Sequence, residues 1–211
     1  MNESKLIEVF KDSQRLLKYY RKTVLKYQPY TPAQYLYFKI IGFKKQELYL
    51  DSFIELCYAT LCAWNMNQRA AKLAKYEDFK SSLLANYSEI QKLQLVSLRE
   101  ASEEDFSDLK TIFNSISIVA KGKSKLVATS KCLHFFLPNL VLPIDRKYTI
   151  AFFKTTVPKD REKQAEKFIE IQKAAQSFVK EVSLVTLLDL EWNRNIPKLI
   201  DNLIICQKPP K

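Results

Sequence analysis

Asp145 is the acidic residue whose position most favours chemistry. It follows the irregular stretch LPNLVLPI and stands where the sequence predicts that a helix begins. A carboxyl group with a reference pKa of about 3.9 is ionised at neutral pH, so it can stabilise a developing positive charge or activate a water molecule. Aspartate is also a favoured N-cap residue, and in PIDRKYT it would cap the following helix. One side chain can serve both roles, and both stay open.

The segment KGKSK provides a candidate phosphate-binding turn between two expected helices. Backbone N–H groups at the start of the second helix, together with lysine side chains, suit a phosphate. The residues of this candidate site are Lys121, Gly122, Lys123, Ser124 and Lys125. The alternative is a plain interhelical turn that carries solvated lysines.

Basic charge is concentrated around this turn. The chain has a formal charge of +11 and a pI of about 9.4. Seven lysines and arginines lie between Ser117 and Lys154, against one acidic residue. Lys131, Arg146 and Lys147 extend the candidate phosphate-contacting set. Such an excess of positive charge attracts polyanions through counterion release. We therefore expect a nucleic acid, and DNA in particular, as the partner. The alternative is a surface that is lysine-rich without a specific partner.

Aromatic and amide side chains give a candidate base pocket. Trp64, Asn65 and Asn67 follow an apolar run, and such groups stack on and hydrogen-bond a base that has left the duplex. The alternative is a helix end whose asparagines bind free carbonyl groups. His134 in CLHFF and Tyr148 in RKYT complete the candidate pocket, with a core position as the alternative for each.

The sequence predicts neither a metal nor a cofactor. The four cysteines, Cys57, Cys62, Cys132 and Cys206, form no CxxC pair, and His134 is the single histidine. No signal peptide opens the sequence and no apolar run approaches a membrane span. We therefore expect a cytoplasmic protein with buried, reduced cysteines, no membrane partner and a monomeric state.

Glycine content indicates the fold class. Hydrophobic residues make up 47% of the chain, which is ample for a core, but there are only two glycines, Gly42 and Gly122. Tight hairpins need glycine at their turns, and Rossmann or P-loop sites need several glycines close together. The sequence therefore predicts an all-α protein.

Apolar periodicity predicts the individual helices. The expected spans are 3–27, 35–41, a central buried helix within ELYLDSFIELCYATLCAW, 102–118, 124–137, 159–180 and 196–206. Ser102 and Asp105 have the spacing of a capping box. We expect one domain of two helical lobes, 45–115 and 1–44 plus 116–211, with the C-terminal third serving mainly for packing.

The order of these parts resembles the helix-hairpin-helix DNA glycosylases, the endonuclease-III-like superfamily. KGKSK matches the hairpin turn, LVATSKCLHFF the helix after it, and LPNLVLPID the loop that ends at the aspartate. FIELCYATLCAWNMNQRAAKL is similar to a helix of the first lobe whose polar end lines the base pocket. The resemblance covers about half of the chain, and Ser124 replaces the second glycine of the family's hairpin.

The resemblance implies a two-lobed helical fold with a DNA-binding hairpin. It implies that Asp145 supports cleavage of a glycosidic bond, and that Lys125 is the nearest counterpart of the lysine found in members that also cleave the DNA strand. The leading hypothesis is therefore a DNA glycosylase for a modified or damaged base. A non-catalytic nucleic-acid-binding module and a protein–protein adaptor with a basic face are the alternatives.

Overall fold

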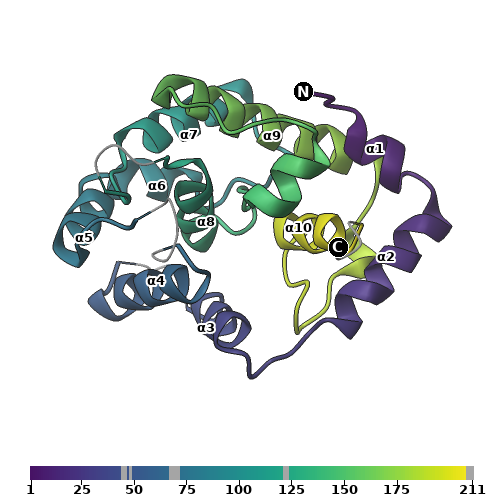
Figure 1. The fold of residues 1–211 in the computed structure, drawn as a ribbon, viewed down its shortest axis with the longest axis horizontal. Coiled ribbons are helices and arrows are strands. Elements are labelled where there is room, and N and C mark those ends of the chain that lie inside the picture. The colour runs from purple at the N-terminus through teal and green to yellow at the C-terminus, as the bar shows by residue number, and fades with distance from the viewer. Residues whose placement is uncertain (44–46, 48, 67–71, 121–123, 208–211) are drawn as a thin grey trace.

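The computed structural model describes residues 1–43, 47, 49–66, 72–120 and 124–207 of the chain. Within these ranges every regular element is a helix, and the one β-bridge joins Leu73 to Val119 (Figure 1). The all-α prediction is therefore confirmed.

Ten α-helices, a π-helix (η2) and a 3-10 helix (η3) are described. In chain order they are α1 (Lys5–Phe10), α2 (Ser13–Leu25), α3 (Pro32–Ile40), α4 (Asp51–Ala63), α5 (Tyr76–Ala85), α6 (Tyr87–Leu93), α7 (Glu103–Ser115), α8 (Leu126–Phe136), η2 (Arg146–Ile150), α9 (Arg161–Glu181), η3 (Val185–Leu187) and α10 (Ile196–Gln207).

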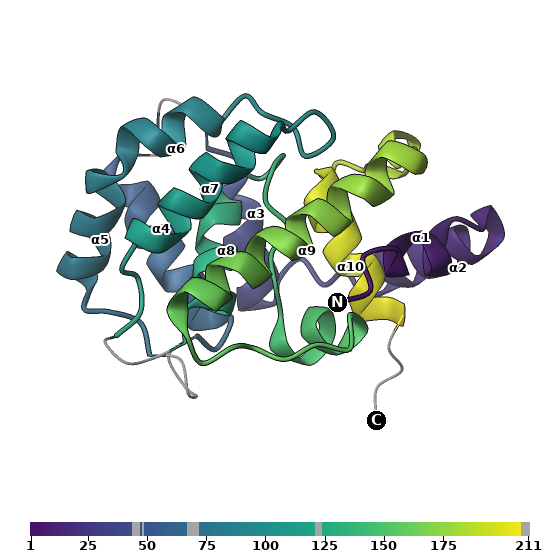
Figure 2. The same cartoon turned by 90° about the horizontal axis from the view of Figure 1, so that it is seen from above.

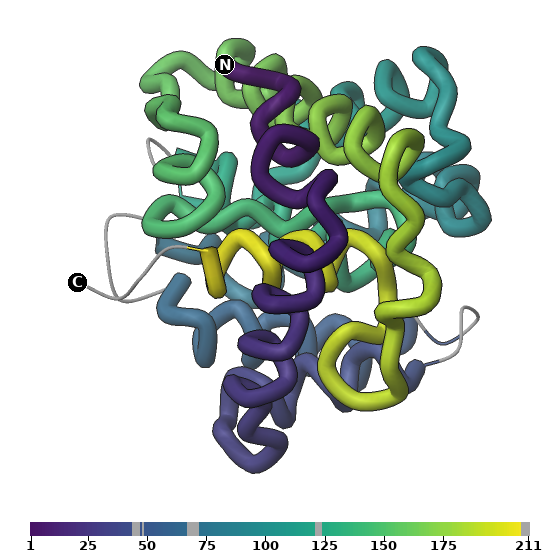
Figure 3. Tube along the Cα trace, turned by 90° about the vertical axis from the view of Figure 1, so that its right-hand side faces the viewer, coloured from purple at the N-terminus to yellow at the C-terminus, as the bar shows by residue number. Residues whose placement is uncertain are grey.

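The expected single helix over 3–27 is wrong, because the chain breaks between α1 and α2. The Asp12 carboxylate accepts a hydrogen bond of 2.7 Å from the backbone N–H of Arg15 and caps α2. Aspartate is a strong N-cap, so it starts a new helix where the apolar periodicity alone runs on. Figure 3 shows α2 crossing the outer side of α10, against which it packs, while α1 packs against α9.

The central buried helix is α8, and the expectation that this role belonged to α4 is wrong. Every residue of α8 except Val127 is buried, whereas Asp51, Glu55 and Ala59 of α4 are exposed. In Figures 1 and 2, α8 lies inside a surround of helices that includes α4 and α9, both of which it contacts. α8 is enclosed although it carries the polar residues Thr129, Ser130, Lys131 and His134, so its sequence shows no wholly apolar circumference.

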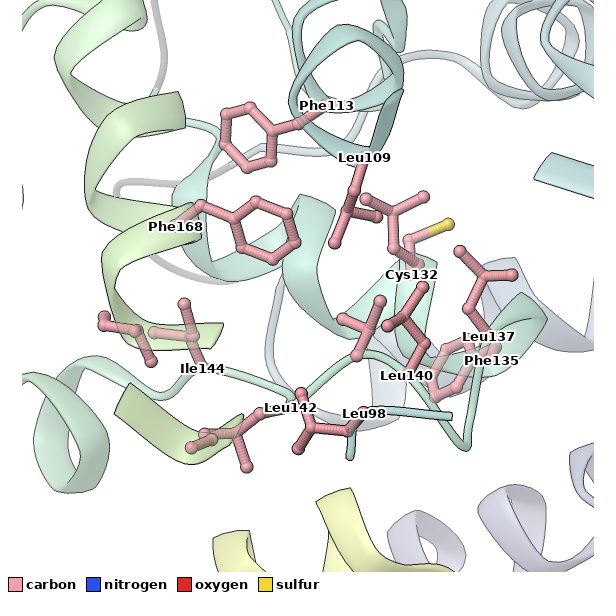
Figure 4. Packing of buried hydrophobic residues seen from close by; sticks show 14 of the residues in the cluster. Leu98, Leu109, Phe113, Cys132, Phe135, Leu137, Leu140, Leu142, Ile144 and Phe168 are labelled. Atoms are coloured by element: carbon pink, nitrogen blue, oxygen red, sulfur yellow. The ribbon is translucent and has the colours of Figure 1, made fainter. Parts of the chain in front are cut away.

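One hydrophobic cluster joins both halves of the chain. Phe113 of α7 stacks on Phe168 of α9, with ring centroids 4.8 Å apart, beside Leu109 and Cys132 (Figure 4). The division into lobes 45–115 and 1–44 plus 116–211 stays a prediction.

The connection between α7 and α8 differs from the expected one. The capping box of Ser102 and Asp105 is confirmed, but α7 ends at Ser115 rather than near Ile118. The chain then runs extended, and the backbone N–H of Ala74 donates to the carbonyl of Ile118 at 3.0 Å. Gly122 lies outside the described residues, so the hairpin itself stays a prediction.

Candidate functional site

Asp145 and Lys131 form an ion pair at the edge of the central helix. Lys131 lies in the middle of α8, and its Nζ is 3.1 Å from Oδ2 of Asp145. The loop after α8 returns to it because the backbone N–H of Ile144 donates to the Ser130 hydroxyl at 3.0 Å. The Lys131 side chain is 10% exposed and the Asp145 side chain 27%. Solvent therefore reaches the carboxylate more than it reaches the amine.

Asp145 also caps η2. Its Oδ1 accepts hydrogen bonds from the backbone N–H groups of Lys147 and Tyr148, at 2.7 and 3.3 Å. Burial acts to raise the pKa of the Asp145 carboxyl group, but the Lys131 charge and these hydrogen bonds outweigh it, so the pKa lies below its ordinary value. The expected N-cap role is confirmed, and the carboxylate is ionised at neutral pH.

Trp64 lies against this ion pair. It follows the last residue of α4, and its indole N–H donates to the carbonyl of Ala33 at 2.9 Å, which fixes the ring. The Lys131 ammonium is 5.3 Å from the centroid of the indole, within the range of a cation–π contact. The structure therefore brings together three of the residues singled out from the sequence, Trp64, Lys131 and Asp145.

Asn65 ends α4 and does so through its backbone. Its φ of 61° lies in the left-handed region. Its backbone N–H donates to the carbonyl of Cys62 at 2.9 Å, and the backbone N–H of Met66 donates to the carbonyl of Leu61 at 3.0 Å. This is a Schellman end with asparagine in the place that glycine usually takes. The exposed Asn65 thus fits the helix-end alternative, and Asn67 lies outside the described residues.

A second lysine approaches Trp64. Lys198 of α10 is buried, and its ammonium lies 5.6 Å from the Trp64 ring centroid, 4.6 Å from that of Trp192 and 5.5 Å from that of Tyr37. Its Nζ pairs with Oδ2 of Asp201 at 2.6 Å. The α10 helix, expected to serve for packing, therefore carries a charged pair into the interior.

Sequence reasoning missed this pair, although it left a signal. PKLIDN places a lysine and an aspartate three residues apart in a helix that is otherwise almost wholly apolar. Charged residues are rarely buried unless they are paired, so a lysine and an aspartate one helical turn apart in such a helix predict a buried ion pair.

His134 is a core residue. It is fully buried, its Nδ1 lies 2.6 Å from the carbonyl oxygen of Val141, and its Nε2 lies 2.8 Å from the Tyr37 hydroxyl. Burial lowers the pKa of His134 to about 3, although the bond to Val141 acts the other way. The neutral ring therefore donates from Nδ1 and accepts at Nε2, which leaves neither nitrogen for a base.

Lys125 and Ser124 have structural contacts. The buried Lys125 ammonium donates to the carbonyls of Asn114 and Ile116, both at 3.1 Å, and so closes the end of α7. Burial lowers the pKa of this amine to about 8. Gln164 Oε1 accepts from the Ser124 hydroxyl and from the backbone N–H groups at the start of α8. The donor groups of Lys125 and Ser124 therefore bind other parts of the protein. The lysine that contacts Asp145 is Lys131 and not Lys125.

Exposed basic residues adjoin Asp145. Arg146 and Lys147 are exposed, and the Lys147 ammonium lies 5.2 Å from the centroid of the half-buried Tyr148 ring. Of the other candidate phosphate-contacting residues, Lys121, Gly122 and Lys123 lie outside the described residues.

Two expected absences can be examined in the described part of the chain. No helix there is long and apolar enough to cross a membrane. No group of three histidine, cysteine, aspartate or glutamate side chains in that part is placed to hold a metal ion. All four cysteines are unbonded thiols.

No family model, curated protein or solved structure matches this chain.

Proposed function

We propose that this chain binds DNA and cleaves the glycosidic bond of a modified or damaged base, with Asp145 as the catalytic carboxylate. One observation carries the proposal: an ionised, partly exposed carboxylate paired with Lys131 beside the face of Trp64. The resemblance to the helix-hairpin-helix glycosylases in chain order points to the same aspartate.

The chemistry requires an anion next to the sugar. As the bond between sugar C1′ and the base nitrogen breaks, its electron pair goes to the base and positive charge develops on the sugar. Asp145 stabilises that charge, or takes a proton from the water that attacks C1′. The base nitrogen is then protonated, so the products are the free base and an abasic site.

Lys131 and Trp64 have supporting roles in this proposal. The Lys131 ammonium keeps the neighbouring carboxyl group ionised, which preserves the charge that the reaction needs. Trp64 offers an aromatic face on which an extruded base can stack. Because Lys131 is already paired with Asp145, its contribution to phosphate binding is smaller than the sequence alone predicts.

Arg146 and Lys147 supply positive charge next to the carboxylate, and Lys121 and Lys123 add to it along the sequence. Several phosphate contacts give a steep fall in affinity with salt, with a slope of about −0.9 per contact on logarithmic axes. We expect the combined Lys121→Ala and Lys123→Ala variant to flatten this slope. The matched control, Lys11→Ala directly after α1 with Lys18→Ala on α2, should change it less.

The activity test uses duplex oligonucleotides that carry a panel of modified bases. After incubation, alkali cleaves the strand wherever a base has been released. Asp145→Asn should lower base release by about 100-fold or more while DNA affinity stays near that of the natural chain, because the amide keeps the shape but loses the charge. Normal excision by Asp145→Asn would refute the assignment of Asp145.

A second candidate function is a non-catalytic nucleic-acid-binding module. It is favoured by the fact that both Asp145 oxygens already have partners, Oδ1 in the cap and Oδ2 in the ion pair. In that case no oligonucleotide of the panel yields an abasic site, while the salt-dependent binding and its loss in the Lys121 and Lys123 variant persist.

A further inference from the structure

The side of α2 that is turned away from α10 carries exposed apolar residues among basic ones. This outer face of α2 consists of Gln14, Leu17, Lys18, Arg21, Val24 and Leu25, all of them exposed. Leu17, Val24 and Leu25 are 42%, 45% and 84% exposed. In Figure 3 no described segment lies in front of this helix. Large apolar side chains that gather on an exposed surface mark a site of interaction.

A hollow of about 280 Å³ lies within the outer face. Its described lining consists of Gln14, Leu17, Lys18 and Arg21, which stand at positions i, i+3, i+4 and i+7 of one helix. Four residues with this spacing form the hole that receives a side chain of a neighbouring helix in knobs-into-holes packing. The hollow therefore has the geometry of a site for one side chain of a second helix.

The same spacing continues along the helix. Gln14, Leu17, Arg21 and Val24 are separated alternately by three and four residues, which is the spacing of the a and d positions of a coiled coil. Leu25 stands seven residues, about two turns, after Lys18 on the same edge of the face. Since α2 has 13 residues, its outer face has the length of about two heptads.

The charge of this part of the chain has one sign. No acidic residue lies between Asp12 and Glu47 in the sequence. Lys18 and Arg21 border the hollow, and neither belongs to an ion pair between described residues. Opposite charges across an interface select the partner and fix its register. A partner that covers this face therefore brings acidic groups to Lys18 and Arg21.

Three other occupants fit these features less well. In a twofold pair of copies the face would meet itself, so Lys18 and Arg21 would lie opposite like charges. The phosphates of a nucleic acid would pair with the basic residues but would leave Leu17 and Val24 without apolar contacts. A lipid surface would make no use of a hollow with the spacing of one side chain. A helix with apolar and acidic side chains uses all three features.

We propose that the outer face of α2 binds an acidic amphipathic helix of a partner protein. An apolar side chain of that helix enters the hollow beside Leu17, and the carboxylates that flank it pair with Lys18 and Arg21. This surface shares no residue with the Lys131–Asp145 pair, so the interaction is independent of the proposed DNA chemistry.

The test titrates the full chain with three synthetic peptides of three heptads each, followed by calorimetry. The first peptide has leucine at positions a and d and glutamate at e and g. The second has lysine in place of glutamate, and the third has serine in place of leucine. We expect the leucine–glutamate peptide to bind with a Kd of about 10–100 μM. The other two should bind at least about tenfold more weakly, because one lacks the complementary charge and the other the apolar side chains.

Variants then locate the binding on α2. Lys18→Glu combined with Arg21→Glu should weaken binding of the leucine–glutamate peptide at least about tenfold and should strengthen binding of the leucine–lysine peptide. The matched control combines Lys92→Glu on α6 with Lys163→Glu on α9, both at exposed positions. It changes the net charge by the same amount and should alter affinity less than about threefold. Leu17→Ala should weaken binding about tenfold. Circular dichroism checks that each variant folds.

Four results would overturn the proposal. They are no saturable binding of the leucine–glutamate peptide below about 1 mM, equal binding of the leucine–lysine peptide, equal binding of the serine peptide, or a charge-reversed α2 variant that folds and binds as tightly as the natural chain. Vesicles of phosphatidylcholine with phosphatidylserine and a duplex oligonucleotide are titrated in parallel. If the α2 variant lost affinity for one of these while the natural chain bound no peptide, the face would belong to a lipid or a nucleic acid instead.

Discussion

Two lysine–aspartate pairs approach Trp64 through their ammonium groups, and they differ in their access to solvent. In the pair of Lys131 and Asp145 the side chains are 10% and 27% exposed, whereas in the pair of Lys198 and Asp201 they are 5% and 8% exposed. The first pair adjoins exposed basic residues, and the second is enclosed by aromatic rings. The same chemical groups therefore occupy two different environments around one indole.

The difference separates a structural role from a chemical one. Removing two ions from water costs several kcal/mol, and only close geometry repays it, as in the 2.6 Å contact of Lys198 with Asp201. A sealed pair cannot meet a substrate, so its effect is on the fold and on the position of Trp64. The half-open pair retains a carboxylate that solvent, and hence a ligand, can reach.

Breaking the sealed pair should have the largest effect on stability. Lys198→Met leaves the buried Asp201 carboxylate without its partner, so the free energy of unfolding should fall by about 3–5 kcal/mol in urea titrations. The double variant Lys198→Met with Asp201→Leu removes both charges and should recover most of the loss. If the free energy of unfolding of Lys198→Met were within about 1 kcal/mol of that of the natural chain, the pair could not be buried as described.

The buried His134 should make the stability of the protein depend on pH. Its folded pKa of about 3 lies below the unfolded value of about 6.5, so at acid pH the unfolded chain binds a proton that the folded chain does not. The resulting stability is present above pH 6.5 and is lost as the pH falls towards 3. Between pH 6.5 and 5 this single group should cost about 1–2 kcal/mol.

The measurement is direct because the chain has one histidine. The imidazole C–H proton signals should stay constant from pH 8 to about 5 in NMR spectra. A midpoint near pH 6.5 would mean that the ring is exposed and that the Tyr37–His134 contact is absent.

Asp145→Ala should lower the free energy of unfolding by at least about 1 kcal/mol, because it removes the cap of η2 and also leaves the mostly buried Lys131 ammonium without its partner. Asp145→Asn should cost less, since asparagine is also a good cap. Urea titration of both variants checks the order. An alanine variant as stable as the natural chain would show that the cap contributes nothing.

Local signals in the sequence predicted much of the fold. The scarcity of glycine indicated helices, the Ser102 and Asp105 spacing predicted the start of α7, and the expected 159–180 and 196–206 lie within two residues of α9 and α10. These features depend on residues a few positions apart, which is where capping and periodicity act.

The site was predicted only in part, because its members come from distant parts of the chain. Trp64 and Asp145 could be singled out one by one, but the pairing of Lys131 with Asp145 depends on how the loop after α8 returns to that helix. Lys198 reaches Trp64 only through the packing of α10. Asp12 breaks the first helix although the apolar pattern continues in phase, so periodicity alone could not reveal the break.

The exposed pair of Lys11 and Glu181 should have the smallest effect. Its atoms are 3.2 Å apart, similar to the 3.1 Å of Lys131 and Asp145, but the side chains are 69% and 47% exposed. Solvent screens such a pair, and ordering two long side chains offsets most of the attraction. Glu181→Gln should therefore change the free energy of unfolding by less than about 0.5 kcal/mol, and added salt should reduce even that. If urea titrations instead gave a loss comparable to that of Lys198→Met, distance rather than burial would govern these ion pairs, and the contrast between the two pairs near Trp64 would lose its basis.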